Sequence, residues 1–141
     1  MIENIVNEHI ITNKMHDHQF LYLGIEPKEK IIANNIYKFN DINFTKKSYD
    51  HAIINCFLEK QNHCDIDSIL NVIFLNVKYF IFLNINCDYE STNLSLLHPT
   101  AWIEKLQKFK LPDHTVLFHF SLYKDYDILN YDKYNTELTI R

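Results

Sequence analysis

The densest apolar run in the sequence lies between Asp65 and Tyr89, and its periodicity changes halfway along. In its first half apolar residues recur every three or four positions, at Ile66, Ile69, Leu70, Ile73, Phe74 and Val77. This spacing predicts a helix that buries one side, with Asp65 or Asp67 available to cap its start. From residue 77 to residue 87, β-branched and aromatic residues dominate, which is typical of a central strand covered on both faces. The run therefore predicts a helix followed closely by a core strand.

The same run raises the alternative of a membrane span, because residues 69–87 form a stretch of 19 residues. Lys78 lies near its middle, where a lysine costs about 2.5 to 3.5 kcal/mol on insertion scales. Four amides add to that cost: Asn71, Asn76, Asn84 and Asn86. We therefore interpret the run as part of a water-soluble core and expect no membrane partner.

The length of 141 residues fits one domain with a single sizeable core, so we predict one globular unit spanning residues 1–141. The formal net charge is −4, and the only arginine is Arg141. The guanidinium groups that read phosphates and guanine are therefore missing, and we expect no nucleic-acid partner. Gly24 is the only glycine, which excludes glycine-rich phosphate loops and dinucleotide fingerprints, so no cofactor is expected.

The N-terminal residues and the cysteines predict a cellular compartment. Residues 1–15 carry Glu3 and Glu8 before the first lysine and contain no sustained apolar run, so they fit neither a secretory signal nor a transit peptide. The cysteines are odd in number and lack the spacing of a disulfide scaffold: Cys56, Cys64 and Cys87. Reduced thiols in a cytoplasmic protein are the plain interpretation.

The other segments predict a mixture of strands and helices. Alternating or β-rich patterns predict strands at residues 9–12, 19–25, 115–123 and 136–141, the last two paired with each other. Ser48 is a good cap for a predicted helix at residues 49–60, and Pro99 opens a second clear helix.

Two segments fit more than one structure, and the element order leads to a fold class. Residues 1–8 fit either a short helix or an arm, while residues 27–39 combine features of a helix and a strand. The order predicts the α+β class: a single domain with a mixed or antiparallel sheet and about three helices packed on it. A three-layer α/β arrangement is the second choice.

The sequence contains eight histidines, which are candidate metal ligands. His16 and His18 flank Asp17 and could present two imidazoles on one face of a strand. Softer ligands are available in three residues farther along the chain: Cys56, His63 and Cys64. Neither group has a recognised ligand spacing, and a zinc site needs three or four converging ligands, so no metal site is expected.

Two tetrapeptides share the form histidine, any residue, threonine or serine, apolar residue. They begin at His98 (HPTA) and at His119 (HFSL). This form resembles the signature of two-histidine phosphoesterases, and the resemblance covers eight residues. It implies that the two imidazoles act as acid and base on a phosphodiester while the hydroxyls bind its oxygens. A phosphoesterase-type enzyme that uses His98 and His119 is therefore the alternative functional hypothesis.

Residues 123–137 interleave tyrosines with carboxylates, against only two lysines. Tyrosine supplies a large and rigid contact area, and acidic charge steers the encounter with a basic surface. We predict seven partner-binding residues here: Tyr123, Asp125, Tyr126, Asp127, Tyr131, Asp132 and Tyr134. The competing interpretation is a hairpin whose tyrosines pack half-buried over the sheet edge.

Small size and acidic charge favour binding over catalysis. We predict a small acidic protein-binding module, an inhibitor or an immunity protein that neutralises a basic protein toxin or enzyme. The expected partner is accordingly a basic protein.

Overall fold

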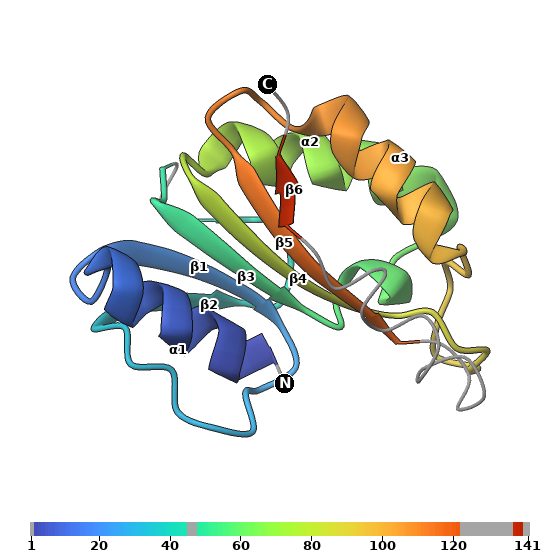
Figure 1. Cartoon of the computed structure of the whole chain (residues 1–141). Coiled ribbons are helices and arrows are strands. Elements are labelled where there is room, and N and C mark those ends of the chain that lie inside the picture. Colours follow the sequence, from blue (N-terminus) through green and yellow to red (C-terminus); the bar gives the residue numbers. More distant parts are fainter. Residues whose placement is uncertain (1, 45–47, 122–136, 140–141) are drawn as a thin grey trace.

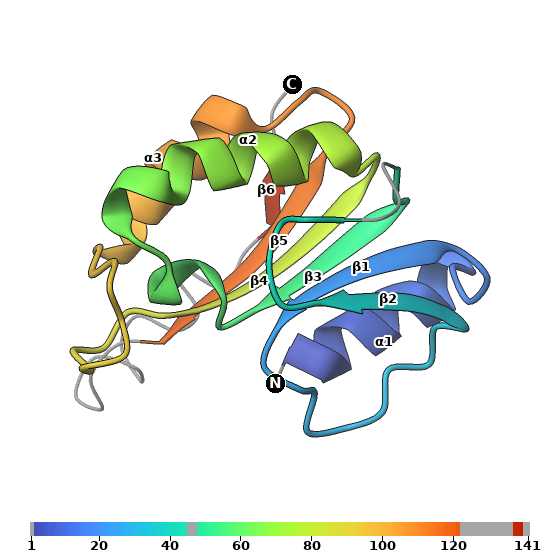
Figure 2. The same ribbon diagram turned by 180° about the vertical axis from the view of Figure 1, so that it is seen from behind.

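The computed structural model describes residues 2–44, 48–121 and 137–139. Five parallel strands lie in the order β2-β1-β3-β4-β5, and a short β6 pairs antiparallel with β5 at one edge. Figures 1 and 2 show the sheet from its two sides. In chain order the elements are α1 (Ile2–Asn13), β1 (Gln19–Gly24), β2 (Asn35–Phe39), β3 (His51–Asn55), the 3-10 turns η1 (Leu58–Lys60) and η2 (His63–Asp65), α2 (Ile66–Asn76), β4 (Phe80–Asn86), α3 (Pro99–Phe109), β5 (Thr115–Ser121) and β6 (Glu137–Thr139).

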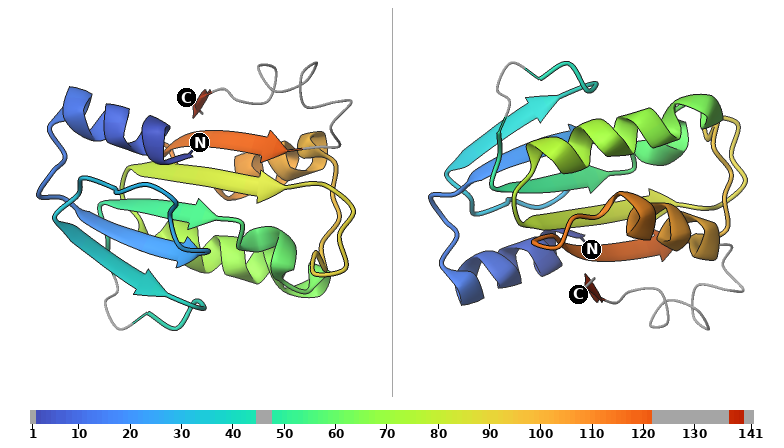
Figure 3. Two further views of the ribbon diagram at one scale, coloured as in Figure 1. Left: turned by 90° about the horizontal axis from the view of Figure 1, so that it is seen from below. Right: turned by 90° about the horizontal axis from the view of Figure 1, so that it is seen from above.

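The helices cover the two faces of the sheet unequally. Among the described helices, α1 is the one on the first face, where it buries Val6 and Ile10 against Phe20, Ile53 and Phe82. α2 and α3 lie together on the other face and bury the larger apolar cluster. Figure 3 shows α1 and α2 on opposite sides of the sheet. The sheet is therefore the middle of three layers, as its apolar central strands require.

The predicted α+β class, with a mixed or antiparallel sheet, is wrong. The five central strands are all parallel, and three helices accompany them, which makes the fold α/β. Parallel neighbours need a crossover connection, and α2 and α3 supply it between β3, β4 and β5. Of the described strands, only β6, paired with β5, runs in the opposite direction.

The two halves of the central apolar run are confirmed. α2 begins at Ile66 after Asp65, although the Asp65 side chain makes no capping hydrogen bond. β4 then places Phe82 in the core at 1% exposure. Phe80 is only half-buried, because it borders a groove of about 470 Å³ between α1 and the start of β5. A strand covered on both faces is expected to have both rings largely buried; Phe82 is fully buried, and Phe80 keeps part of its surface exposed beside the groove.

Two predicted elements have the wrong type. The helix expected at residues 49–60 is instead β3, followed by η1. All five residues of β3 are buried, since it lies between β1 and β4 with helices on both faces. A strand covered on both faces has no polar side, and its apolar run cannot be distinguished from a helix by periodicity. The strand expected at residues 9–12 belongs to α1.

The remaining predicted elements are confirmed within a residue or two. β1 and β5 occupy the predicted strand segments, and α3 begins at Pro99. β6 pairs with β5 as expected, and the ambiguous segment 27–39 contributes the strand β2 at its end.

Across the ranges that the structure describes, none of the helices has both the length and the apolar character needed to cross a membrane. The three thiols are unpaired.

Candidate functional site

The strand order creates a topological switch point between β1 and β3. From β1 the chain moves outward to β2, then returns past β1 and continues through β3, β4 and β5 on the other side. In open α/β sheets, ligands bind in the crevice outside the carboxyl ends of the strands at such a point. Polar residues gather at this edge: β3 ends at Asn55, and β4 carries Asn84 near its end.

A chain of hydrogen bonds crosses four strands at this edge, and we call its members the polar row: Tyr22, Asn55, Asn84 and His119. His119 Nδ1 lies 3.1 Å from Asn84 Oδ1, and Asn84 Nδ2 donates to Asn55 Oδ1 at 2.9 Å. Asn55 Nδ2 donates to the Tyr22 hydroxyl at 3.0 Å, and that hydroxyl donates to the carbonyl of Ile25. Because the Asn84 NH₂ group donates to Asn55, the Asn84 side chain faces His119 with its oxygen, which can only accept. Neutral His119 therefore carries its proton on Nδ1.

Gly24 is required where the polar row crosses β1. It lies opposite Asn55 in the parallel register and has φ of +110°, a conformation that L side chains rarely adopt. A Cβ at this position would approach the Asn55 carbonyl oxygen to 1.8 Å. The missing side chain therefore allows the backbones of β1 and β3 to approach each other closely beside the polar row.

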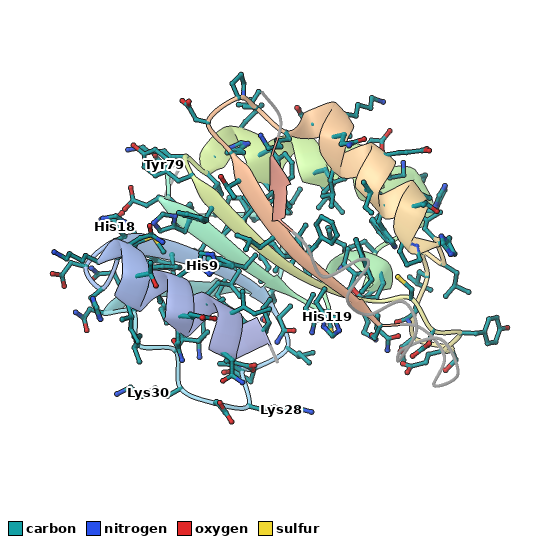
Figure 4. All side chains as sticks on the ribbon, viewed as in Figure 1. His9, His18, Lys28, Lys30, Tyr79 and His119 are labelled. Atoms are coloured by element: carbon teal, nitrogen blue, oxygen red, sulfur yellow. The ribbon has the colours of Figure 1, made fainter. Side chains whose placement is uncertain are left out.

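A crevice of about 260 Å³ lies above the polar row, beside the first turn of α1. Figure 4 shows His119 at this edge of the sheet, on the side of α1. Lys28 also lines the crevice. Glu3 also lines the crevice and is 3% exposed, with Oε1 accepting the Lys28 backbone N–H at 2.9 Å. No lysine or arginine forms an ion pair with Glu3 in the part of the chain that the structure describes.

The crevice carries charges of both signs, since Glu3 and Glu26 line it together with Lys28. Burial and the nearby carboxylates of Glu3 and Glu26 together raise the pKa of Tyr22 to about 12, against the lowering effect of its hydrogen bond with Asn55. Burial also raises the pKa of the Cys56 thiol to about 12, so Cys56 stays protonated and is no nucleophile near neutral pH. The two carboxylates of the described lining outnumber its one lysine, so the crevice favours a hydrogen-bond donor or a cation.

A histidine pair occupies the opposite, amino edge of the sheet, where Figure 4 shows His18 and Tyr79. His51 is 1% exposed, and its Nδ1 accepts the backbone N–H of Phe80 at 3.2 Å. Neutral His51 therefore carries its proton on Nε2, which lies 2.9 Å from His18 Nδ1. Burial, together with the neighbouring His18, lowers the pKa of His51 to about 4.

The structure does not assemble the metal ligands considered from the sequence. His16 is exposed, whereas His18 bonds to His51. A metal on His51 Nε2 would require a proton on Nδ1, but that nitrogen accepts the Phe80 N–H. His63 and Cys64 are exposed on the turn before α2. Among the described residues, no three His, Cys, Asp or Glu side chains are placed to hold a metal ion together.

The two histidines of the phosphoesterase-like tetrapeptides lie on different sides of the sheet. His98 caps α3, and its ring nitrogen accepts the Thr100 N–H at 3.2 Å. α3 packs on the face that Phe118 and Phe120 share, whereas His119, which lies between them in β5, points to the α1 face. The geometry therefore does not bring the two imidazoles to one phosphodiester.

The seven predicted partner-binding residues lie outside the residues that the structure describes: Tyr123, Asp125, Tyr126, Asp127, Tyr131, Asp132 and Tyr134.

Sequence reasoning missed the polar row and the buried histidine pair. One signal for the row is present, because Asn55 and Asn84 each follow an apolar run of the kind that forms core strands. The signal is hidden at Asn55, since the pattern of its segment also fits a helix.

In comparisons with known proteins, the chain matches no family model, no curated protein and no solved structure.

Proposed function

We propose that this chain binds a small organic cation, such as a primary or quaternary amine, in the crevice at the carboxyl edge of the sheet. The observation that carries the proposal is the polar row below a crevice lined by the buried Glu3 carboxylate, at the topological switch point. Support comes from the position, since switch points are where open α/β sheets bind ligands. Further support comes from the charge, since a buried carboxylate is stabilised by a cationic ligand.

The polar row lowers the stability of the fold, and a role in ligand binding would explain why it is present. Four polar side chains on the inner face of a sheet contribute less to stability than apolar side chains of similar size. Their hydrogen bonds run in one direction, from His119 through Asn84 and Asn55 to Tyr22, so each member fixes the orientation of the next. Such a network supplies a rigid floor for a ligand, which lowers the entropy lost on binding.

A titration with small amines tests the proposal. We expect methylamine, ethanolamine, putrescine or choline to shift the NMR signals of His119 and of the first turn of α1, whereas acetate and phosphate leave them unchanged. Glu3→Gln keeps the acceptor for the Lys28 N–H but removes the charge, so it should weaken amine binding by about tenfold or more. Glu29→Gln, which changes an exposed acid outside the crevice, is the matched control. Anion binding, or equal amine affinity of both variants, would contradict the proposal.

A second candidate is the protein-binding function, in which the chain neutralises a basic protein toxin or enzyme through the segment 123–134. The observation that favours it is the surface beside the end of β5. Ser121, the last residue of β5, accepts the Cys87 N–H at 2.7 Å, and Tyr89 and Glu90 follow, both exposed. Exposed aromatic and acidic groups thus follow directly on the residue that bonds to the end of β5.

Two substitutions test the protein-binding candidate. Asp127→Lys should slow association with the basic partner and make it less salt-sensitive, since steering by charge acts on the encounter. Tyr126→Ala should speed dissociation and cost about 2 kcal/mol or more of binding. Affinity titrations measure both effects, and thermal melts should show unchanged folding stability. A destabilised Tyr126→Ala protein with unchanged affinity would support the hairpin-packing interpretation instead.

A further inference from the structure

The charges that line the crevice at the carboxyl edge of the sheet are not all compensated. Glu26, one of its two carboxylates, forms an ion pair with Lys38, whose Nζ lies 2.8 Å from Glu26 Oε2. Glu3 and Lys28 line the same crevice, and neither forms an ion pair among the residues that the structure describes. One negative and one positive charge therefore remain uncompensated side by side in one crevice.

These two charged residues are adjacent but differ in depth. Glu3 is 3% exposed, and its Oε1 accepts the backbone N–H of Lys28 at 2.9 Å. Lys28 is exposed and belongs to the loop between β1 and β2, so its flexible four-carbon stem reaches the crevice from the solvent side. The crevice therefore holds a carboxylate in its interior and an ammonium group at its mouth.

The polar row below the crevice offers acceptors, and its amide donors are all in use. Both N–H groups of the Asn55 amide donate, to the Tyr22 hydroxyl and to the carbonyl of Ile25. Both N–H groups of the Asn84 amide donate as well, to Asn55 Oδ1 at 2.9 Å and to Cys56 Sγ at 3.6 Å. Each amide oxygen can accept two hydrogen bonds, and the polar row supplies one of them. The ligand group that meets this floor must therefore be a donor.

We propose that the crevice binds a small amino acid as a zwitterion, with its ammonium group at Glu3 above the polar row and its carboxylate at Lys28. This inference rests on the proposed cation site and names the class of its ligand. The ammonium group donates to the Glu3 carboxylate and to the amide oxygens of the floor, and the carboxylate accepts from the Lys28 ammonium group.

Charge and volume both favour such a ligand over a simple amine. A zwitterion compensates both charged residues, whereas an amine leaves Lys28 unpaired and places a second cation near it. The crevice volume of about 260 Å³ lies below the usual range of pockets for drug-sized ligands, so the amino acid is a small one.

Serine and ethanolamine test this inference, because they differ only in the carboxylate. In NMR titrations the wild type should bind serine about threefold or more tightly than ethanolamine, since one exposed pair of charges contributes a modest energy. Lys28→Met removes the charge and should abolish the preference without weakening the binding of ethanolamine. Lys30→Met is the matched control and should keep the preference, because Lys30 is an exposed lysine of the same loop, labelled with Lys28 in Figure 4, that does not line the crevice.

Salt provides a second readout of the same contact. The preference for serine should shrink as sodium chloride is added, because the exposed Lys28 charge is screened. Equal affinities of the wild type for the two compounds would overturn the inference, as would a preference that Lys28→Met retains; in both cases the binding of ethanolamine still supports the cation site. If neither compound binds, the proposed function fails together with this inference. Circular dichroism melts of both variants confirm that folding is intact.

Discussion

Replacing Phe82 with alanine should lower the free energy of unfolding by about 3 to 5 kcal/mol. The ring is 1% exposed in the middle of β4 and packs against the α1 face of the core. Its removal loses the transfer free energy of the side chain and leaves a cavity between the sheet and α1 that the packed neighbours fill only in part. A loss of this size is a large part of the stability of a typical domain. Urea unfolding of the purified variant measures it.

Phe80→Ala is the matched control for that measurement. It removes the same atoms from the same strand two residues earlier, but Phe80 is half-buried beside the groove next to α1. The rings stack with 5.8 Å between their centroids, so both substitutions remove that contact, and the difference between them measures burial. We expect a clearly smaller loss for Phe80→Ala. Equal losses would mean that α1 does not cover β4 as described.

Acidification should destabilise the protein through His51. The pKa of His51 is about 4 in the folded protein, against an ordinary value of 6.5, because the ring is buried beside His18. The unfolded chain therefore binds a proton at a higher pH than the folded one. The contribution of His51 is fully present above pH 6.5 and is lost as the pH falls from about 6.5 to about 4, by about 3 kcal/mol in total. Urea unfolding at pH 7, 6 and 5 measures this slope.

The variant His51→Gln isolates this effect from other titrating groups. Glutamine can still accept the Phe80 N–H and donate to His18, but it has no titrating proton. The buried Glu59 remains in both proteins; burial raises its pKa, so its contribution to stability is lost as the pH rises, with the opposite sign. We expect a flatter stability profile between pH 7 and pH 5 in the variant. An unchanged slope would show that His51 does not titrate as the structure requires.

The sequence by itself determined the elements whose apolar pattern has only one interpretation. The spacing from Ile66 to Val77 specifies a helix with one buried side, and α2 has those boundaries to within a residue. Pro99 starts α3, because proline at the first helical position has no hydrogen bond to lose. β1 and β5 likewise carry local patterns that no tertiary contact had to override.

Only the tertiary structure decided what depends on neighbours distant in the chain. β3 is a strand because β1 and β4 pair with it on both sides, and its short apolar run alone fits a helix equally well. The parallel direction of the strands, and with it the fold class, follows from the crossovers and has no local signature. The polar row joins residues 33 and 29 positions apart, from Tyr22 to Asn55 and from Asn55 to Asn84. Hydrogen bonds of that range depend on which strands are neighbours in the sheet, and the apolar pattern of one segment does not specify its neighbours.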